Sequence, residues 1–436
     1  MKNHNTTQTK YSSNIHQTFF SQLMIGVAFA STLVAANYSN AHGAPSAQDI
    51  RDASSGEAQN WIHLRAKDKY QRSAIANLGV SIEFVKGEDV YSFANQEQIQ
   101  SLKKLGVLVE SVPALHPEDF PSEDARYHNY DELTQELQAL SANNTDIMSL
   151  GSIGRSVEGR EIWIVHLNND LPNSKARPGI IYMGGHHARE HLSVELPMAY
   201  INFFINEYRK GNPRVTSLLQ TRDIQIIPAV NPDGLEYDIS TGNYKLWRKN
   251  RRRIDPRNFG VDLNRNYGFQ WGTGGSSQNP GSDVFMGPKP FSEPETIAIR
   301  DHINANTHIT TVLSFHTFSK LILYPWGHKY SGIENDRDRR VHETMARTMA
   351  KWNGYEPMQS SELYIASGDT TDWTYGEKKM ISFTFELDPG NDGSYMGFYP
   401  GAAIIDEVIR KNLEPILYLA EKAGNPYQVI DSAAGL

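Results

Sequence analysis

The chain has 436 residues, of which 39% are hydrophobic, 21% are charged and none is Cys. This composition fits a globular protein with a sizeable core, and the length is enough for two or three domains. The net charge of −8 argues against a nucleic-acid-binding protein. The lack of Cys excludes disulfides, thiolate metal sites and cysteine nucleophiles, so any metal ion must be held by His and carboxylates.

The first 41 residues have the features of a signal peptide. A polar leader with Lys2 and Lys10 precedes an apolar run of 14 residues, Leu23 to Ala36, and Ser39–Ala41 forms a small-x-small cleavage signal. The run is short for a membrane span, which makes a membrane anchor the less favoured alternative. We therefore expect a secreted or periplasmic protein with no membrane attachment after the signal is removed.

Residues 58–112 are expected to form a compact unit. Four segments have the patterns of strands, at 61–66, 80–86, 90–94 and 107–112. Two segments between them have helical spacing, at 68–78 and 95–105. The order βαββαβ predicts a small ferredoxin-like domain. Proline and acidic residues then mark a linker over 113–126.

Residues 127–424 are expected to form one α/β domain. Four apolar runs are continuous, as in strands buried on both faces, at 179–183, 224–230, 310–315 and 381–385. Helical patterns separate these runs, which predicts an α/β fold with a mixed, mostly parallel central sheet and helices on both faces. Residues 425–436 are left as a C-terminal tail.

Residues 184–191, with the sequence GGHHAREH, directly follow the first buried run and precede a helix that Ser193 is expected to cap. Ligands collect at strand ends of this kind in α/β sheets. Zn²⁺ accepts imidazole and carboxylate ligands, and catalytic sites commonly combine two near ligands with a distant one. His187 and Glu190 could form the near pair, whereas His187, Glu190 and His191 together match the inverted zinc-protease motif. The Gly–Gly turn before them favours the first pairing.

Further motifs occur in order along the chain: IGRSVEGR at 153–160, NPDG at 231–234, LWRKN at 246–250, VDLNRN at 261–266, SFHTF at 314–318, SELY at 361–364 and FTFE at 383–386. Together with residues 184–191, this set resembles the zinc metallocarboxypeptidases of the carboxypeptidase A/B type, the M14 peptidase family, over about residues 127–424. The resemblance implies a carboxypeptidase with one Zn²⁺ per chain. Its ligands would be His187, Glu190 and His316, with a position left open for water.

The unit at 58–112 resembles the pro-segment of this family, which shields the active site until it is cut away. The resemblance therefore implies a zymogen-like precursor, an activating protease as a partner and a cleavage region near Arg126. The other partner would be the C-terminus of a peptide or protein substrate. Nucleic acid is not expected as a partner, and nothing in the sequence demands more than a monomer.

The resemblance also implies roles in catalysis and carboxylate binding. Glu386 would be the general base that takes a proton from the attacking water, and Arg248 would stabilise the oxyanion. Arg265 would pair with the terminal carboxylate of the substrate, and Asn264 and Tyr364 would add hydrogen bonds to it. Four of these residues also have a simpler interpretation. Glu386 could be a salt-bridge partner, Arg248 part of a solvated basic run, Asn264 an Asx turn and Tyr364 a surface aromatic.

Substrate choice depends on three further residues. Arg189 would contact the substrate one residue further in, or pair with an acidic neighbour. Thr371 occupies the position that tunes the specificity pocket in the family, and threonine selects neither basic nor large apolar side chains. Asp369 either faces the pocket floor, where it could pair with a basic side chain, or caps a turn. We therefore expect broad specificity for apolar and also basic C-terminal residues.

The sequence leaves three alternatives to a peptide carboxypeptidase. One is a peptidase of the same fold that acts on peptidoglycan stem peptides, and another is a non-catalytic peptide-binding homologue. The third, an endopeptidase built on the inverted motif, would leave His316, Arg265 and Glu386 without roles.

Overall fold

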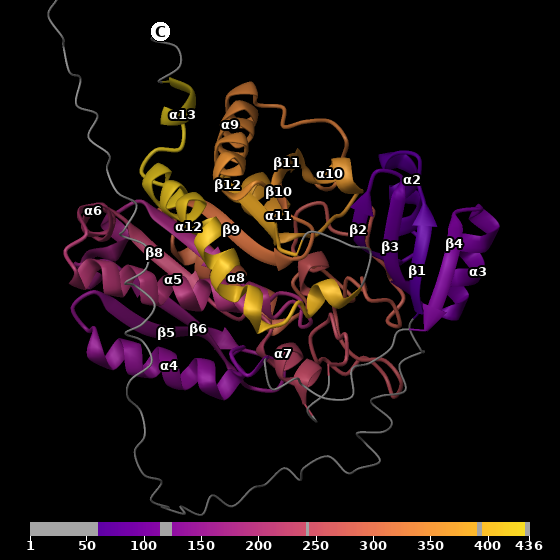
Figure 1. The fold of residues 1–436 in the computed structure, drawn as a ribbon, viewed down its shortest axis with the longest axis horizontal. Coiled ribbons are helices and arrows are strands. Elements are labelled where there is room, and N and C mark those ends of the chain that lie inside the picture. The colour runs from indigo at the N-terminus through magenta and orange to yellow at the C-terminus, as the bar shows by residue number, and fades with distance from the viewer. Residues whose placement is uncertain (1–59, 114–123, 241–243, 390–394, 432–436) are drawn as a thin grey trace, which may run out of the picture. The chain divides into compact units, whose positions relative to one another are not determined.

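The computed structural model describes residues 60–113, 124–240, 244–389 and 395–431 (Figure 1). The predicted signal peptide at 1–41 lies outside these residues. Among the described residues the strands form two sheets, and both sheets belong to one compact unit.

The first sheet lies in residues 60–113, which we call the N-terminal unit. Its elements are β1 (Asn60–Arg65), α2 (Lys69–Ala76), β2 (Ser81–Lys86), β3 (Asp89–Ala94), α3 (Gln96–Leu105) and β4 (Leu108–Pro113). The strand order is β2-β3-β1-β4, and neighbouring strands are antiparallel. The predicted βαββαβ order and ferredoxin-like layer are therefore confirmed.

Both faces of this small sheet are covered. On one face, α2 and α3 pack on the strands in a core that includes Ile62, Leu64, Ile75, Ile99 and Leu102. On the other face, Trp61, Phe84 and Phe93 pack against Phe318 and Phe398. These two residues belong to the described residues from 124 to 431, which we call the larger part of the chain. Aromatic burial of this kind is a strong source of docking energy. The N-terminal unit is thus joined to the larger part through a continuous apolar contact.

The second sheet has eight strands among the described residues. They are β5 (Met148–Arg155), β6 (Glu161–Leu167), β7 (Gly179–Met183), β8 (Asp223–Ile227), β9 (Ile309–Thr317), β10 (Leu321–Tyr324), β11 (Glu356–Gln359) and β12 (Ile381–Leu387). The order is β11-β10-β12-β9-β7-β8-β6-β5. The pairs β11–β10, β12–β9, β9–β7 and β7–β8 are parallel, and the others are antiparallel. The predicted mixed, mostly parallel sheet is confirmed.

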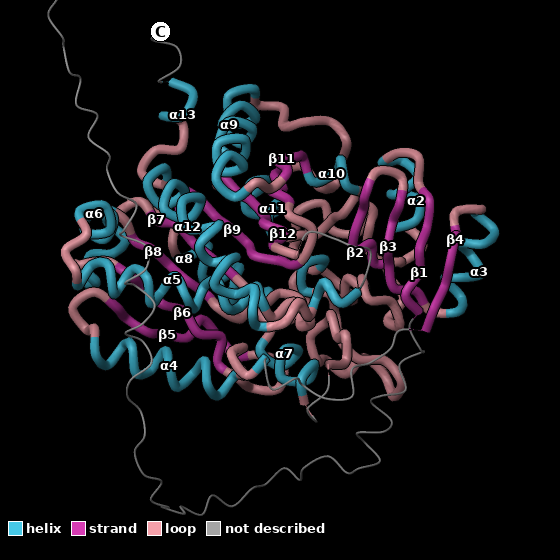
Figure 2. Tube along the Cα trace, viewed as in Figure 1, coloured by secondary structure: helices cyan, strands magenta, loops and turns pink. Residues whose placement is uncertain are grey.

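Helices lie on both sides of this sheet, as Figure 2 shows in cyan. They are α4 (Tyr130–Asn143), α5 (Leu192–Arg209), α6 (Pro213–Thr221), α7 (Pro232–Ile239), α8 (Pro294–Ala305), α9 (Asp336–Asn353), α10 (Ser360–Leu363), α11 (Thr370–Lys378), α12 (Ile405–Lys422) and α13 (Gln428–Asp431). Local signals set some of their ends: Asn129 and Glu132 form a capping box at the start of α4, and Gly354 ends α9 with a φ of 72°.

Strand β7 shows how the continuous apolar pattern arises. Ile180 and Tyr182 belong to the core beneath α4, α5, α6, α9 and α12, whereas Ile181 and Met183 belong to the core beneath α8 and α11. Because successive side chains of a strand point to opposite faces, a strand covered on both sides has no polar alternation.

The parallel strands β7, β9 and β12 end at the same edge of the sheet. In the β9–β12 pair, His316 lies directly opposite Glu386. The predicted run at 224–230 is longer than the strand, because β8 ends at Ile227 and the chain then turns along the sheet edge. The loops that follow these strand ends converge on one place, where the functional site lies.

Two features complete the fold. None of the helices in the described residues is both long enough and apolar enough to cross a membrane. The region predicted as a tail begins with ordered structure, because α13 follows α12 and Ile430 is buried in the main core.

Candidate active site

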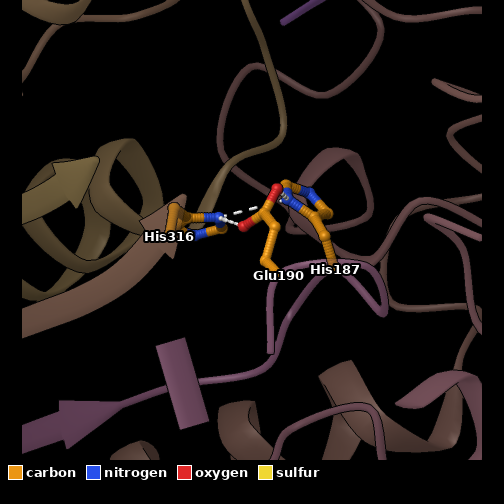
Figure 3. A group of neighbouring side chains, drawn as sticks. All are labelled: His187, Glu190 and His316. Atoms are coloured by element: carbon orange, nitrogen blue, oxygen red, sulfur yellow. Dashed lines mark hydrogen bonds and ion pairs between the residues drawn. The ribbon is translucent and has the colours of Figure 1, made fainter. Parts of the chain in front are cut away.

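Three buried side chains meet at the carboxyl ends of β7 and β9, with His316 still inside β9 (Figure 3). Their ligand atoms all lie within 4.8 Å of one another. The Nδ1 atoms of His187 and His316 are 3.1 Å apart, and Glu190 Oε1 and Oε2 lie 2.8 Å and 3.0 Å from them. Two imidazole nitrogens that face each other across a carboxylate fit a shared divalent cation, and this donor set is one that Zn²⁺ prefers. His187, Glu190 and His316 could therefore hold one metal ion.

The Gly–Gly turn after β7 shapes this group. A Cβ at Gly184 would lie 2.1 Å from the carbonyl oxygen of Ser193, and Gly185 has a φ of +64°. The Ser193 hydroxyl accepts a hydrogen bond from the Gly185 N–H and donates one to the Glu190 carbonyl. The prediction that Ser193 caps the helix was wrong: α5 begins at Leu192, and the Ser193 hydroxyl closes the preceding turn instead.

The two other histidines of this motif turn away from the metal group. His191 Nε2 lies 2.9 Å from Asp238 Oδ2. His186 lies near the hydroxyls of Tyr267 and Ser314, and burial lowers its pKa well below the usual value. The structure thus brings together the His187–Glu190 pair with a distant His and does not build the inverted motif.

Asp262 links the metal group to Arg248. Its Oδ1 is 3.2 Å from His187 Nε2, and its Oδ2 accepts a hydrogen bond of 3.0 Å from Arg248 Nε. Burial alone would raise the pKa of Asp262, but Arg248 and His187 hold it well below its usual value. A carboxylate behind a metal-binding His fixes the ring orientation. This residue was not among the predicted site residues, although it stands two positions before Asn264 in the VDLNRN motif.

One pocket of about 690 Å³, including the space open to solvent, lies beside the metal group. Most of the predicted site residues line it: His187, Glu190, Arg248, Asn264, Arg265, Tyr364, Asp369 and Glu386. Three predicted residues do not line it, namely Arg189, Thr371 and His316. Thr371 lies behind the pocket wall, because its hydroxyl is 2.7 Å from that of Thr384, which lines the pocket.

Glu386 lies directly opposite the metal-group residue His316 in the β9–β12 register, and it lines the same pocket as His187 and Glu190. Burial raises its pKa well above the usual value, and the nearby charge of Glu190 adds to the effect. A carboxylate with a raised pKa beside a metal group is suited to accept a proton.

Two arginines line the pocket near this acid. Arg248 is held by Asp262, and its Nη1 lies 3.9 Å from Glu190 Oε1. Arg265 is buried, and it donates hydrogen bonds to the carbonyl oxygens of Gly275 and Asn264. These backbone bonds fix the guanidinium, which faces a pocket that can accept an anionic group.

Asp369 has both of the placements that the sequence left open, at a helix start and in the pocket wall. Its Oδ1 accepts the Asp372 N–H at the start of α11, at 2.8 Å. Its Oδ2 is buried and has no hydrogen-bond partner among the described residues, and the residue lines the pocket. Burial, followed by the charge of Asp372, raises the pKa of Asp369 to about 8. The residue therefore caps a helix with one carboxylate oxygen and also belongs to the pocket wall.

The N-terminal unit inserts an acidic side chain into this site. The pairing of β2 with β3 shifts between Ile82 and Phe84, so Glu83 stands at a bulge, and both Ile82 and Glu83 line the pocket. Glu83 Oε1 is 2.5 Å from Arg189 Nη2, and its Oε2 is 3.9 Å from Arg248 Nη1. Glu83 was not among the predicted site residues, although it is the only acidic residue of the strand SIEFVK.

Arg189 is fully enclosed by the two parts of the chain. Its guanidinium lies 5.1 Å from the centre of the Phe93 ring and 4.6 Å from that of Phe398. It also pairs with Asp283 at 3.1 Å in addition to Glu83. Of the two alternatives for Arg189, the structure therefore contains the pairing with acidic neighbours, here Glu83 and Asp283.

Helix α2 of the N-terminal unit holds the segment that carries Tyr364. Arg72 donates to the carbonyl oxygens of Glu362 and Leu363, each at 2.5 Å. The Ser73 hydroxyl accepts the N–H of Ile365 at 2.8 Å. The Tyr364 side chain packs against the core of the N-terminal unit. The backbone on both sides of Tyr364 is thus fixed by side chains that lie almost 300 positions earlier in the chain.

A mixed α/β sheet whose edge carries a His–Glu–His group, a further glutamate and pocket-lining arginines defines a class of metal-dependent hydrolases. A family model described as zinc carboxypeptidase matches residues 133–415, and the chain belongs to this family. Metallocarboxypeptidases act on the C-termini of peptides, and the cofactor of this chain is zinc. The site described above contains a donor set that fits that metal.

Known proteins similar to the chain agree with this assignment. A zinc carboxypeptidase of Saccharothrix mutabilis subsp. capreolus is 33% identical, over 80% of this chain and 86% of the relative. Carboxypeptidase A5 of Macaca fascicularis is also 33% identical, over 64% of this chain and 63% of that protein, so the chain spans less than two thirds of it. The crystal structure of thrombin activatable fibrinolysis inhibitor matches with a TM-score of 0.67 and 25% identity, over 84% of this chain and 99% of that one.

Proposed function

We propose that the chain is a secreted zinc carboxypeptidase, made as a precursor, that removes single residues from peptide C-termini. The observation that carries this proposal is one pocket that holds three kinds of group together. Its walls include the metal ligands His187 and Glu190, the acid Glu386, and the cations Arg248 and Arg265. A non-catalytic binding protein would have no need of the buried acid beside the metal group.

In the proposed reaction, His187, Glu190 and His316 would hold a Zn²⁺ ion, which would supply Lewis-acid polarisation of the scissile carbonyl and activation of water. Glu386 accepts a proton from the attacking water and later donates it to the leaving amine. Arg248, kept in place by the Asp262 bond, stabilises the negative charge that develops on the carbonyl oxygen.

The same pocket explains why only the last residue would be removed. Arg265 pairs with the terminal carboxylate, because a planar guanidinium binds a carboxylate through two parallel hydrogen bonds. Asn264 and Tyr364 line the pocket beside it and add hydrogen bonds to the chain end. A substrate without a free carboxylate would leave the Arg265 charge without its partner.

We propose broad specificity for apolar and basic terminal residues. Leu323 and Thr384 line the pocket and accept apolar side chains, with Thr371 behind Thr384. The buried Oδ2 of Asp369 can pair with a terminal Lys or Arg when it is ionised. Gly327 leaves room in front of this oxygen, because a Cβ there would lie 3.2 Å from it.

The N-terminal unit is proposed to be a pro-segment that keeps the precursor inactive. Glu83 places a carboxylate between Arg189 and Arg248, where a substrate would bind, and α2 fixes the segment around Tyr364. Release by an activating protease frees both. With a signal peptide at 1–41 and a catalytic domain at 127–424, this gives a protein that is exported first and activated afterwards, and that acts as a monomer.

Release of single amino acids tests the proposed function. The full chain is treated with trypsin, chymotrypsin or glutamyl endopeptidase in separate reactions, and each product is assayed on blocked dipeptides that end in Phe, Leu or Arg. We expect release from all three dipeptides after productive cleavage, little release before it, and loss of activity with 1,10-phenanthroline. No release from any dipeptide by any cleaved form would refute the proposal.

A further inference from the structure

Asp124, which lies in the region predicted as a linker, is built into the larger part of the chain. It is only 2% exposed. Its Oδ1 accepts the N–H of Ala402 at 2.7 Å, and its Oδ2 accepts the hydroxyl hydrogen of Tyr244 at 2.8 Å. A buried carboxylate is tolerated only when hydrogen bonds compensate for lost hydration. One side chain thus joins two loops that are about 160 residues apart in sequence.

The next residues are also fixed to the larger part. Arg126 binds both carboxylate oxygens of Asp406, at 2.6 Å and 3.2 Å. Tyr127 is buried, and the His128 N–H donates to Glu195 Oε1 at 2.7 Å. Each of these partners lies in a helix that packs on the main sheet rather than in the N-terminal unit.

The contact at Tyr244 leads toward the catalytic pocket. The Tyr244 ring stacks on that of Tyr399 at 3.7 Å between ring centres. The Tyr399 hydroxyl accepts the Leu246 N–H at 3.1 Å, and Arg248 follows two residues later. Asp124 therefore holds one end of the short segment that delivers Arg248 to the pocket.

We infer that Asp124 is a positioning residue of the catalytic unit, and that the activating cut is made N-terminal to it rather than after Arg126. This inference rests on the proposed removal of the N-terminal unit by proteolysis. Proteases cut exposed segments whose backbone can detach, and the bonds of Asp124, Arg126 and His128 oppose that. A cut after Arg126 would also remove the Asp124 carboxylate from Tyr244 and Ala402.

The chain offers a sharp test of the position of the cut. Between Lys104 and Tyr127, Arg126 is the only residue after which trypsin can cleave, whereas glutamyl endopeptidase can cleave after Glu110, Glu118 or Glu123. The full chain is digested with each enzyme, and the N-termini of the products are determined by mass spectrometry. We expect an active product that begins at or before Asp124 with glutamyl endopeptidase, and no product that begins at Tyr127 with trypsin. A fully active product that begins at Tyr127 would overturn the inference.

Variants test the positioning role separately. We expect Asp124→Ala, after release with glutamyl endopeptidase, to lower kcat about tenfold to 100-fold with little change in KM, because a misplaced Arg248 weakens transition-state stabilisation. Asp124→Asn should recover part of the loss, because its amide oxygen can still accept the Ala402 N–H. The control Asp131→Asn, at an exposed position of α4, should behave as the wild type.

Hydrogen exchange gives a readout that does not depend on activity. In the full-length Asp124→Ala chain, the Ala402 amide should exchange at least about tenfold faster than in the wild type, and the Asp131→Asn chain should not differ. If the wild type released no amino acid, the proposed function would fail while this measurement still tested the Asp124 contact. Unchanged exchange together with unchanged kcat in Asp124→Ala would refute the positioning role.

Discussion

Glu386 is the residue on which the proposed chemistry depends most directly. Its raised pKa and its register opposite His316 suit it to accept a proton. Replacing it by Gln keeps the shape and removes the base, so kcat should fall by about 10²-fold to 10⁴-fold while KM stays nearly constant. The measurement is release of Leu from a blocked dipeptide. The control Glu356→Gln, at an exposed position of β11, should be fully active, and an equally active Glu386→Gln would exclude the residue as the base.

Asp369 predicts a pH-dependent choice between basic and apolar substrates. Burial raises its pKa to about 8, so the carboxyl group is neutral below that pH and charged above it. Only the charged form attracts a terminal Arg. The ratio of kcat/KM for Arg-ended over Leu-ended dipeptides should therefore rise about tenfold between about pH 7 and about pH 9, since kcat/KM reports the free enzyme.

The matched variants for this experiment are Asp369→Asn and Asp301→Asn. The amide introduced by Asp369→Asn cannot ionise, so the rise with pH should disappear, although the amide oxygen can still cap α11. Asp301 is exposed on α8, and its replacement should leave the ratio unchanged. A rise that persists in Asp369→Asn would show that another group reads the basic side chain.

At the level of single residues, the sequence predicted those that belong to family motifs and missed those that act from elsewhere. His187, Glu190 and Glu386 follow buried strands, so their convergence could be expected. Glu83 could not be, because its direction depends on a bulge that the strand pattern does not reveal. The two roles of Asp369 depend on where each carboxylate oxygen points, and a sequence carries no such information.

A helix or strand could be predicted when its own sequence is long enough to show a clear hydrophobic pattern. The runs that became β7, β9 and β12 are continuous and apolar, so their existence and neighbours followed from hydrophobicity. β9 extends to Thr317, beyond the predicted 310–315, because its ladder with β12 continues through His316. The short strands β10 and β11 carry only four residues each, too few for a recognisable period.

The contacts of helix α2 with the segment around Tyr364 lead to a prediction for the uncut precursor: weakening them should make this segment open more often. Arg72→Ala removes two hydrogen bonds to the carbonyl oxygens of Glu362 and Leu363. Each bond to a charged donor is worth about 1.5–3 kcal/mol, so the segment around Tyr364 should open more often. Faster amide exchange at residues 362–365 in the uncut chain is the expected result. Lys104→Ala, at an exposed position of α3, is the control, and equal exchange in both variants would contradict the proposed clamp.

The arrangement of the whole molecule was the least predictable level. Hydrophobic periodicity predicts the strands and helices within the N-terminal unit and within the larger part. It carries no information on which surfaces of the two parts come into contact. The docking rests on the aromatic residues Trp61, Phe84 and Phe93, and on the Glu83–Arg189 pair. A small sheet that is apolar on both faces does indicate that a partner must cover the second face, and here the partner is the aromatic cluster that includes Phe318 and Phe398.

Metal removal tests the stability of the whole molecule as well as its activity. Only the folded chain brings the Nδ1 atoms of His187 and His316 to 3.1 Å from each other with Glu190 between them. A metal ion bound there therefore stabilises the folded state and not the unfolded chain, and its removal takes away that binding free energy. Metal at about 1,000 times its dissociation constant stabilises a fold by about 4 kcal/mol. Chelation should therefore lower Tm by several degrees in scanning calorimetry, and added Zn²⁺ should restore it where Mg²⁺ does not. The matched variant His316→Ala should show the low Tm with or without chelator, and a wild-type Tm that ignores both chelator and Zn²⁺ would show that these three side chains hold no metal.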